Sequence, residues 1–561
     1  MRANSRNEVA RMTPAEIQAC QWDAIIVGTG IGGATLGYSL AQSGMKVLFC
    51  EKGMDHLSTS TALTGDWTET LFERECEGDS YANYLKRSGR LSDPIFELSG
   101  ITSRAVLPIL GEGTGGSSTL YGMVMERFFP SDFEPAKYAK AATQAQVPER
   151  WPITMEELEP YYSEAEALYR VKATRDPLRP DTECRSILSP PSYSPANSEL
   201  FEYLSAQGCN PYHVPMACDY KPGCRECIGF ICEKRCKGDS VNICLEPALR
   251  EHGAVLADNC DVLKLTTENT CVTTLHCRWN GADVTLRGNT IILAAGAIGT
   301  PALLLRSASK AWPHGLANGS DQVGRNLMRH LFDYYVVKPR KSPHESDLVK
   351  QLAWNDLYIS DGVKLGTVQS NGNLPPPRII ARSMKEDISR HSSVLGFIAS
   401  KFLPVIEQAV KASLKKTIVF ASIMEDYPYP DNRLTLGTDG KVVINYSIHE
   451  NDKERLELFR DKIKKLLKKY HPKLNQAAQK NSLLGHVCGT CRFGESPKDS
   501  VLDRYNKAHE LDNLYVVDSS FFPTSSGTNP SLTIAANALR VAEHILKNHT
   551  NPTPCPTTLY K

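Results

Sequence analysis

Residues 23–52 read DAIIVGTGIGGATLGYSLAQSGMKVLFCEK. Residues 24–27 and 47–50 are short apolar runs, which are typical of strands that helices cover on both faces. Between them, Gly28, Gly30 and Gly33 have the spacing G-x-G-x-x-G. This spacing lets the backbone turn sharply, approach a pyrophosphate and pack the following helix on the strand. The stretch therefore predicts a strand, turn, helix and second strand that together bind a dinucleotide.

An acidic residue ends this unit. Glu51 lies 23 residues after Gly28, where a carboxylate can accept hydrogen bonds from both hydroxyls of an adenosine ribose. An acid at this position disfavours a cofactor with a 2′-phosphate. The phosphates are expected on the free N–H groups at the start of the helix. The residues predicted to contact the dinucleotide here are Gly28, Gly30, Ile31, Gly32, Gly33, Glu51 and Lys52.

The composition limits the class of protein and its partners. The chain has 561 residues, 41% hydrophobic and 23% charged, so it can bury a large core divided into two or three domains. A net charge of +1 gives no reason to expect nucleic acid or an anionic membrane as a partner. No apolar run is long enough for a transmembrane segment, and residues 1–22 do not form a secretory signal. We therefore expect a cytoplasmic protein, with export or membrane association through a partner subunit as the open alternative.

Later stretches predict further sheet and helix structure. Residues 290–301 form another apolar run that enters a glycine turn and a helix, so we place this strand in the first sheet. Hairpins are predicted about Asn280-Gly281 and about Asp439-Gly440. Residues 402–419 have apolar side chains at helical spacing and lysines on the other side. This pattern predicts a basic amphipathic helix, which can lie on a membrane but more often packs on a protein core.

Six of the seventeen cysteines fall within residues 218–244. The odd total, spread through a long chain, indicates a reduced protein rather than a disulfide scaffold. Short intervals of two, four and three residues separate Cys224, Cys227, Cys232 and Cys236. Such spacing could hold zinc or an iron–sulfur cluster, although it matches no common zinc or ferredoxin run. Local disulfides and buried thiols are the two other interpretations, and all three stay open.

Two motifs near the carboxyl terminus carry the chemistry. Residues 485–494 read GHVCGTCRFG, and residues 514–540 read LYVVDSSFFPTSSGTNPSLTIAANALR. With the glycine loop at residues 111–122 and the segments 295–297 and 323–330, they follow the order found in glucose-methanol-choline (GMC) family flavoproteins. The chain resembles this family over nearly its whole length.

The resemblance implies that the dinucleotide is FAD. No histidine precedes Gly115 in the glycine loop, where some relatives attach FAD, so non-covalent binding is expected. Relatives usually carry Asn where Tyr121 stands, so that contact is a departure from the family pattern. The family's catalytic pair falls on His486, as the general base that takes the hydroxyl proton of an alcohol, and on Asn529, as the donor to the substrate oxygen. The further residues implied at the cofactor are Gly116, Ser117, Tyr121, Val262, Asp518 and Asn529.

The resemblance also implies a fold and a domain order. We expect an α/β protein, α+β overall, with a Rossmann-like FAD-binding domain and a discontinuous substrate domain built on an antiparallel sheet. The expected boundaries are a tail at 1–20, the FAD-binding domain at 21–150, 239–335 and 483–548, the substrate domain at 151–238 and 336–482, and a tail at 549–561.

The implied function is oxidation of a primary or secondary alcohol, such as a sugar or a sterol, by hydride transfer to flavin N5. The electron acceptor is open among oxygen, a quinone and a protein. One alternative is the flavoprotein subunit of a multi-subunit dehydrogenase with an iron–sulfur centre in the cysteine cluster. The other is a non-redox member of the family, a lyase or a photoenzyme.

Overall fold

The computed structural model describes residues 12–57, 61–75, 79–99, 102–139, 143–180, 183, 185–344, 347–479 and 484–549. Most of the two expected tails, residues 1–11 and 550–561, lies outside these residues. Residues 14–19, which the sequence analysis assigns to the first tail, instead form helix α1 (Pro14–Ala19). Thr13 and Glu16 make a capping box at its start, and Ile17 is buried in the main core. The segment assigned to the tail thus contains one short helix that packs on the main core.

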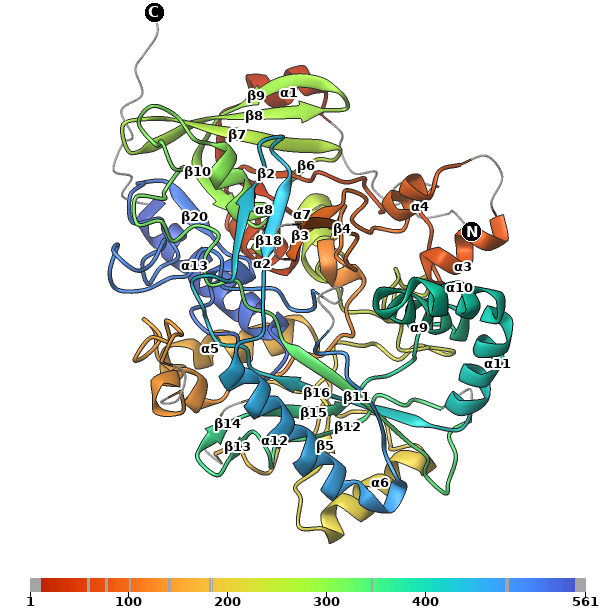
Figure 1. The fold of residues 1–561 in the computed structure, drawn as a ribbon. Coiled ribbons are helices and arrows are strands. Elements are labelled where there is room, and N and C mark those ends of the chain that lie inside the picture. Colours follow the sequence, from red (N-terminus) through yellow and green to blue (C-terminus); the bar gives the residue numbers. More distant parts are fainter. Residues whose placement is uncertain are drawn as a thin grey trace, which may run out of the picture.

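A parallel sheet lies in the upper half of the view in Figure 1. Within the described residues its strand order is β20-β10-β1-β2-β6. Every strand pair is parallel, and the apolar strands and flanking helices form one continuous core. The strands predicted at 24–27 and 47–50, and the placement of 290–301 beside them, are confirmed. The strands are β1 (Trp22–Val27), β2 (Val47–Cys50), β6 (Val255–Ala257), β10 (Gly288–Leu293) and β20 (Leu514–Val516).

Helices pack against this sheet and against one another. Helix α2 follows the glycine turn and packs on β1 and β2, while α13 packs on both α2 and α5. These helices bring the carboxyl-terminal part of the chain against its amino-terminal part (Figure 1). The helices of this half are α2 (Ile31–Gln42), α5 (Met155–Leu168), α7 (Glu246–Glu251), α8 (Gly296–Arg306) and α13 (Ser531–His549).

An antiparallel sheet lies in the lower half of Figure 1, with helices α6 (Pro195–Ala206) and α12 (Glu450–Leu466) packed beside it. Its order within the described residues is β19-β11-β16-β15-β12-β5. It has a core of its own, so the expected combination of a parallel sheet and a separate antiparallel sheet is confirmed. The strands are β5 (Tyr212–His213), β11 (Leu331–Val337), β12 (Leu352–Trp354), β15 (Gly366–Ser370), β16 (Ile418–Met424) and β19 (Lys473–Asn475).

Smaller sheets complete the fold, and both predicted hairpins are confirmed within them. The turn at Asn280-Gly281 joins β8 to β9, and the turn at Asp439-Gly440 joins β17 to β18. The strands are β3 (Ile95–Ser99), β4 (Thr102–Val106), β7 (Cys260–Glu268), β8 (Cys271–Trp279), β9 (Ala282–Leu286), β13 (Ile359–Ser360), β14 (Val363–Lys364), β17 (Arg433–Leu436) and β18 (Val442–Asn445).

The helix predicted at residues 402–419 is only partly correct. Helix α11 (Leu403–Leu414) ends four residues before Ile418, which begins strand β16. Residues 418–420 are β-branched or aromatic and are buried in the antiparallel sheet, where pairing with β11 overrides the helical spacing. The remaining helices are α3 (Thr68–Glu75), α4 (Tyr81–Arg87), α9 (Pro377–His391) and α10 (Ser393–Lys401).

Candidate functional site

The glycines of the first turn have two different tasks. A Cβ atom on Gly28, Gly32 or Gly33 would lie within 2.4 Å of a backbone oxygen, so these positions need glycine for packing. A Cβ on Gly30 would meet no atom within 4 Å, so this residue faces open space. Gly30 is also the N-cap of α2 and provides no side-chain cap, which leaves the first N–H groups of the helix free. An uncapped helix start in front of open space suits a phosphate.

Glu51 lies at the end of β2 and is almost fully buried. Its carboxylate accepts hydrogen bonds from the backbone and hydroxyl of Thr29, at 3.1 and 2.7 Å, and from the backbone N–H groups of Gly53 and Gly113, each at 3.1 Å. Burial raises its pKa against the effect of these bonds. Glu51 therefore fixes the glycine turn to the glycine loop. The neighbouring Lys52 is engaged elsewhere, because its ammonium group pairs with Asp93 at 2.7 Å.

The glycine loop lies directly against the first turn. A Cβ atom on Gly116 would be 3.5 Å from the Cα atom of Gly30, and the N–H of Gly115 donates to the Thr29 hydroxyl at 2.9 Å. Ser117 accepts from a backbone N–H within its own loop. The hydroxyl of Tyr121 donates to the Gly238 carbonyl at 2.5 Å, so this side chain anchors the loop to the cysteine segment.

The remaining predicted cofactor residues lie near the same edge of the parallel sheet. The Asp518 carboxylate follows β20 and accepts from the Gly296 N–H at 3.0 Å, at the start of α8, and from the Thr300 hydroxyl. Val262 lies in β7, two residues after Cys260, whose N–H donates to the Glu51 carbonyl at 2.8 Å. Ligands of such sheets bind at the carboxyl ends of the strands, which is where these residues gather.

A pair of histidines lies at the start of β11 in the antiparallel sheet. His486 and His330 are 156 residues apart in the chain, and their Nδ1 atoms are 2.8 Å apart. His330 immediately precedes β11, and its Nε2 atom lies 3.0 Å from the Ser525 carbonyl and 2.9 Å from the Ser526 carbonyl. His486 has a left-handed backbone with φ of 59°, which is uncommon for a residue with a side chain and is often found at functional sites.

These contacts define the tautomers of the pair. A carbonyl oxygen can only accept, so His330 must carry its hydrogen on Nε2. Burial lowers the pKa of His330 to about 4, and this neutral ring therefore presents Nδ1 as an acceptor. His486 must then donate from Nδ1, which leaves the lone pair of its Nε2 free. Burial, then His330 and Lys350, hold the pKa of His486 well below its ordinary value.

Asn529 lies a few residues after the serines whose carbonyl groups contact His330. Its Oδ1 atom is buried and has no hydrogen-bond partner among the described residues. An unsatisfied buried polar atom is costly, so it marks a position where a bound molecule would supply a donor. Ser525 and Ser526, which orient His330, stand only three or four residues earlier. The structure thus brings the segment of Asn529 to the histidine pair.

Two residues of this centre were not singled out from the sequence. His330 was noted only as the end of a matched segment, and its position in a motif beside a predicted strand was the available signal. Lys350 had no sequence signal. Its ammonium group is buried and donates to the Gly122 carbonyl at 2.8 Å, and burial lowers its pKa to about 8. It adds a positive charge close enough to lower the pKa of His486.

The cysteine segment forms a compact cluster of thiols. Cys218, Cys224, Cys227, Cys232 and Cys236 are free in the structure and pack in one apolar cluster, with the sulfurs of Cys218 and Cys224 3.6 Å apart. Across the described residues, no group of three or more His, Cys, Asp or Glu side chains is placed to hold a metal ion. The geometry therefore supports neither the metal nor the disulfide interpretation for these five residues.

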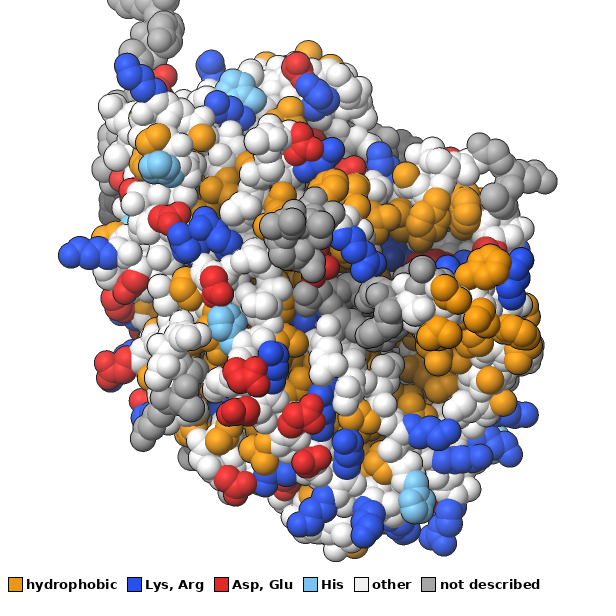
Figure 2. Space-filling view, in the orientation of Figure 1, with side chains coloured by type: hydrophobic (Ala, Val, Ile, Leu, Met, Phe, Trp, Pro, Cys, Tyr) orange, Lys and Arg blue, Asp and Glu red, His pale blue; other side chains and the backbone are white. Residues whose placement is uncertain are grey.

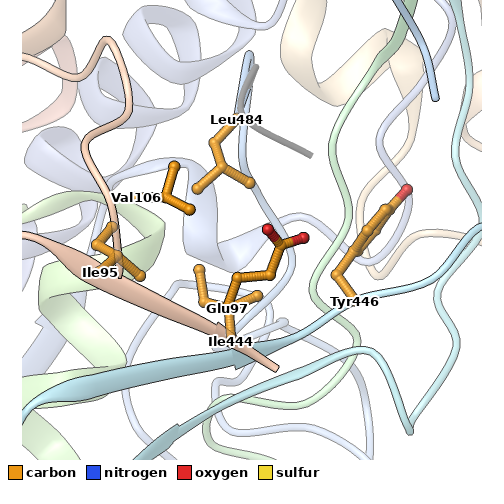
Figure 3. A pocket seen from close by; sticks show the side chains of 6 residues that line it. All are labelled: Ile95, Glu97, Val106, Ile444, Tyr446 and Leu484. Atoms are coloured by element: carbon orange, nitrogen blue, oxygen red, sulfur yellow. The ribbon is translucent and has the colours of Figure 1, made fainter. Parts of the chain in front are cut away.

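A small pocket lies beside the segment that carries His486. Figure 3 shows its lining of aliphatic side chains around the Glu97 carboxylate. The Tyr446 hydroxyl, at one side, donates to Asp426 at 2.7 Å. Neither His486 nor Asn529 is among its lining residues, so this pocket is separate from the histidine centre. It is lined by Ile95, Glu97, Val106, Ile444, Tyr446 and Leu484.

The parallel sheet with its glycine turn is typical of α/β proteins that bind a dinucleotide. The separate antiparallel sheet narrows the class to those with a second domain of this kind. Comparison with known families agrees with this class. Two models described as GMC oxidoreductase match residues 22–332 and 428–538. The chain belongs to the GMC oxidoreductase family, as the sequence motifs predict.

Individual relatives are similar over nearly the whole chain. A 6'''-hydroxyparomomycin C oxidase of Streptomyces lividus is 27% identical, over 93% of this chain and 91% of its own. A 2-methyl-1,2-propanediol dehydrogenase of Mycolicibacterium austroafricanum is 26% identical, over 94% and 95%. The solved structure of a pyridoxine 4-oxidase from Mesorbium loti shares the fold, with a TM-score of 0.59, 20% identity and coverage of 93% and 99%. The protein is an oxidoreductase acting on CH–OH groups, in a family that depends on FAD.

Proposed function

We propose that this protein oxidises a primary or secondary alcohol with non-covalently bound FAD. When bound, FAD supplies the acceptor, at N5, for the hydride that leaves the alcohol carbon. The uncapped start of α2, the open space at Gly30 and the buried carboxylates of Glu51 and Asp518 fit such a cofactor. Gly116, Ser117, Tyr121 and the backbone at Val262 would complete its binding.

The observation that carries the proposal is the 2.8 Å contact between His330 and His486. It leaves His486 neutral, with Nε2 free to take the hydroxyl proton of the alcohol. His330 acts as a positioning residue, because the carbonyls of Ser525 and Ser526 hold its ring in the accepting tautomer.

Asn529 has the second role. Its amide NH₂ group can donate to the substrate oxygen as that oxygen gains negative charge, and its unpartnered Oδ1 atom can accept a hydrogen bond from the bound molecule. A donor placed in advance in a buried site stabilises the developing charge more than water would. His486 and Asn529 would then act on one oxygen, so the effects of their removal should not simply multiply.

The names of the relatives support the substrate class. They do not agree on the electron acceptor, which a direct assay can identify. These names include 6'''-hydroxyparomomycin C oxidase, 2-methyl-1,2-propanediol dehydrogenase and the large subunit of fructose dehydrogenase. We therefore place the substrate among sugars and other hydroxylated small molecules. Oxygen consumption with a turned-over alcohol, compared with reduction of a quinone, assigns the acceptor.

The test is anaerobic stopped-flow reduction of the flavin by a turned-over alcohol. His486→Ala should lower the reduction rate by about 10²- to 10⁴-fold while FAD stays bound, because a positioned base contributes about that much. His314→Ala, at an exposed histidine, is the matched control and should leave the rate unchanged. For the native protein, the rate should hold as the pH falls through 6.5, since His486 stays neutral below its ordinary pKa. A native reduction rate in His486→Ala would show that the base lies elsewhere.

A further inference from the structure

Three helices form the connection between two neighbouring strands of the antiparallel sheet. A few residues would be enough to join these strands. Strands β15 and β16 are antiparallel neighbours, and the N–H of Asn371 donates to the Val419 carbonyl at 2.7 Å to close the pair. Here helices α9, α10 and α11 lie between them and pack on one another at one side of the molecule (Figure 1).

The inner side of this helical group is attached to the rest of the protein. Arg378 of α9 pairs with Glu73 of α3 at 2.7 Å, and Arg382 pairs with the same carboxylate. Ala381 and Val410 are buried within the group. These contacts determine which face of the helices points away from the protein.

The outer face carries large apolar side chains. Seven of the fourteen exposed large hydrophobic residues in the described part of the chain lie in this group, and each is 45% to 67% exposed. Figure 2 shows a hydrophobic patch at the right of the molecule, where Figure 1 places these helices. A contiguous patch of this kind marks an interaction surface. The residues are Met384, Val394, Leu395, Phe397, Ile398, Phe402 and Val405.

Basic side chains border the patch. Residues 377–416 contain eight Lys and Arg against three Asp and Glu, a local charge of +5 in a chain whose total is +1. Lys401, Lys411, Lys415 and Lys416 are exposed, and Figure 2 shows lysines and arginines gathered below the hydrophobic patch. An apolar face with a lysine border is the pattern of helices that lie in a membrane interface.

We propose that the outer face of α9, α10 and α11 binds the surface of an anionic lipid bilayer. The seven apolar side chains would enter the boundary between head groups and acyl chains, and the bordering lysines would contact the phosphates and carboxylates of the lipids. Among the described residues, no helix combines the length and the apolar character that a membrane span needs. A second copy fits less well, because its symmetric approach would bring two strongly basic segments together.

The test is co-sedimentation of the full-length, flavin-loaded protein with vesicles. Vesicles of phosphatidylcholine mixed with phosphatidylserine should bind it, and binding should weaken as salt rises. Phe397→Glu/Phe402→Glu should reduce the affinity at least about tenfold, because two aromatic side chains no longer enter the bilayer. Lys411→Glu/Lys415→Glu should reduce binding to the mixed vesicles more than to phosphatidylcholine alone.

The matched control is Leu178→Glu/Leu188→Glu, which alters two exposed leucines outside the helical group and should bind as the native protein does. Flavin content confirms that each variant is folded. Two results would overturn the proposal: no sedimentation with the mixed vesicles, or equal sedimentation of Phe397→Glu/Phe402→Glu and the native protein. A native dimer in solution that Phe397→Glu/Phe402→Glu converts to a monomer would assign the face to a second copy instead.

Discussion

The parallel and antiparallel sheets bury different kinds of side chain. All four residues of β2 in the parallel sheet are apolar and buried. In the antiparallel half, Asp333 in β11 is fully buried and pairs with Arg460 of α12 at 2.6 Å. Lys364, at the end of β14 in the small neighbouring sheet, contacts Asp132 and Glu425, and none of the three side chains is exposed.

This difference separates two ways of fixing a structure. Apolar strands gain free energy from burial itself and need no particular partner. A buried charge needs its partner, because the cost of removing it from water is recovered only by a close opposite charge. In the antiparallel half, removal of a buried charged side chain should therefore lower the free energy of unfolding far more than removal of an exposed one.

Among the predictions that test this comparison, removal of the Lys364 ammonium group should change the free energy of unfolding most. Lys364→Met leaves the buried carboxylates of Asp132 and Glu425 without their shared cation, and it should lower the free energy of unfolding by about 3–5 kcal/mol. Lys462→Met, which breaks a partly exposed pair with Asp361, is the matched control and should cost about 0–1 kcal/mol. Urea unfolding measures both, and equal losses would contradict the distinction.

The glycine turn of the parallel half allows a second, somewhat smaller test. Gly32→Ala places a Cβ atom 2.1 Å from the Val517 carbonyl, so it should lower the free energy of unfolding by about 2–3 kcal/mol. Gly30→Ala places its Cβ in open space, so the protein should stay folded but bind less FAD. Unfolding of the two apoproteins and their flavin content separate packing from cofactor binding. Full flavin content in Gly30→Ala would remove this residue from the cofactor site.

The smallest of the three predicted effects is a pH dependence of the free energy of unfolding, and it comes from His330. Its pKa is about 4 in the folded protein and 6.5 ordinarily, so below pH 6.5 the unfolded chain binds a proton that the folded chain does not. This group should therefore remove about 2 kcal/mol of stability between pH 7 and pH 5.

The control for this effect is a pair of histidine substitutions. In His330→Gln the loss of unfolding free energy between pH 7 and pH 5 should be smaller than in the native protein by that amount, because glutamine does not titrate. His314→Gln, at an exposed position, should leave the pH dependence unchanged. An unchanged dependence in His330→Gln would show that His330 is not the group responsible.

The sequence alone determined three strands of the parallel sheet, the glycine turn, both hairpins and the family. These features depend on residues close together in the chain, such as Gly28 to Gly33, whose local backbone and packing requirements appear directly in the order of residue types. The predicted helix at 402–419 was wrong at its end for the opposite reason. Ile418 belongs to a strand because it pairs with Val337. Val337 lies far away in the chain, so the local pattern around Ile418 does not reveal this pairing.

Only the tertiary structure decided the arrangement of the proposed catalytic centre. The His330–His486 pair joins residues 156 positions apart, and the Asp333–Arg460 pair joins residues 127 apart. Lys350 became part of the centre only through burial beside the glycine loop. The tautomer of His486 and the low pKa of both histidines arise from desolvation and from these distant partners, and no local spacing in the sequence encodes either of them.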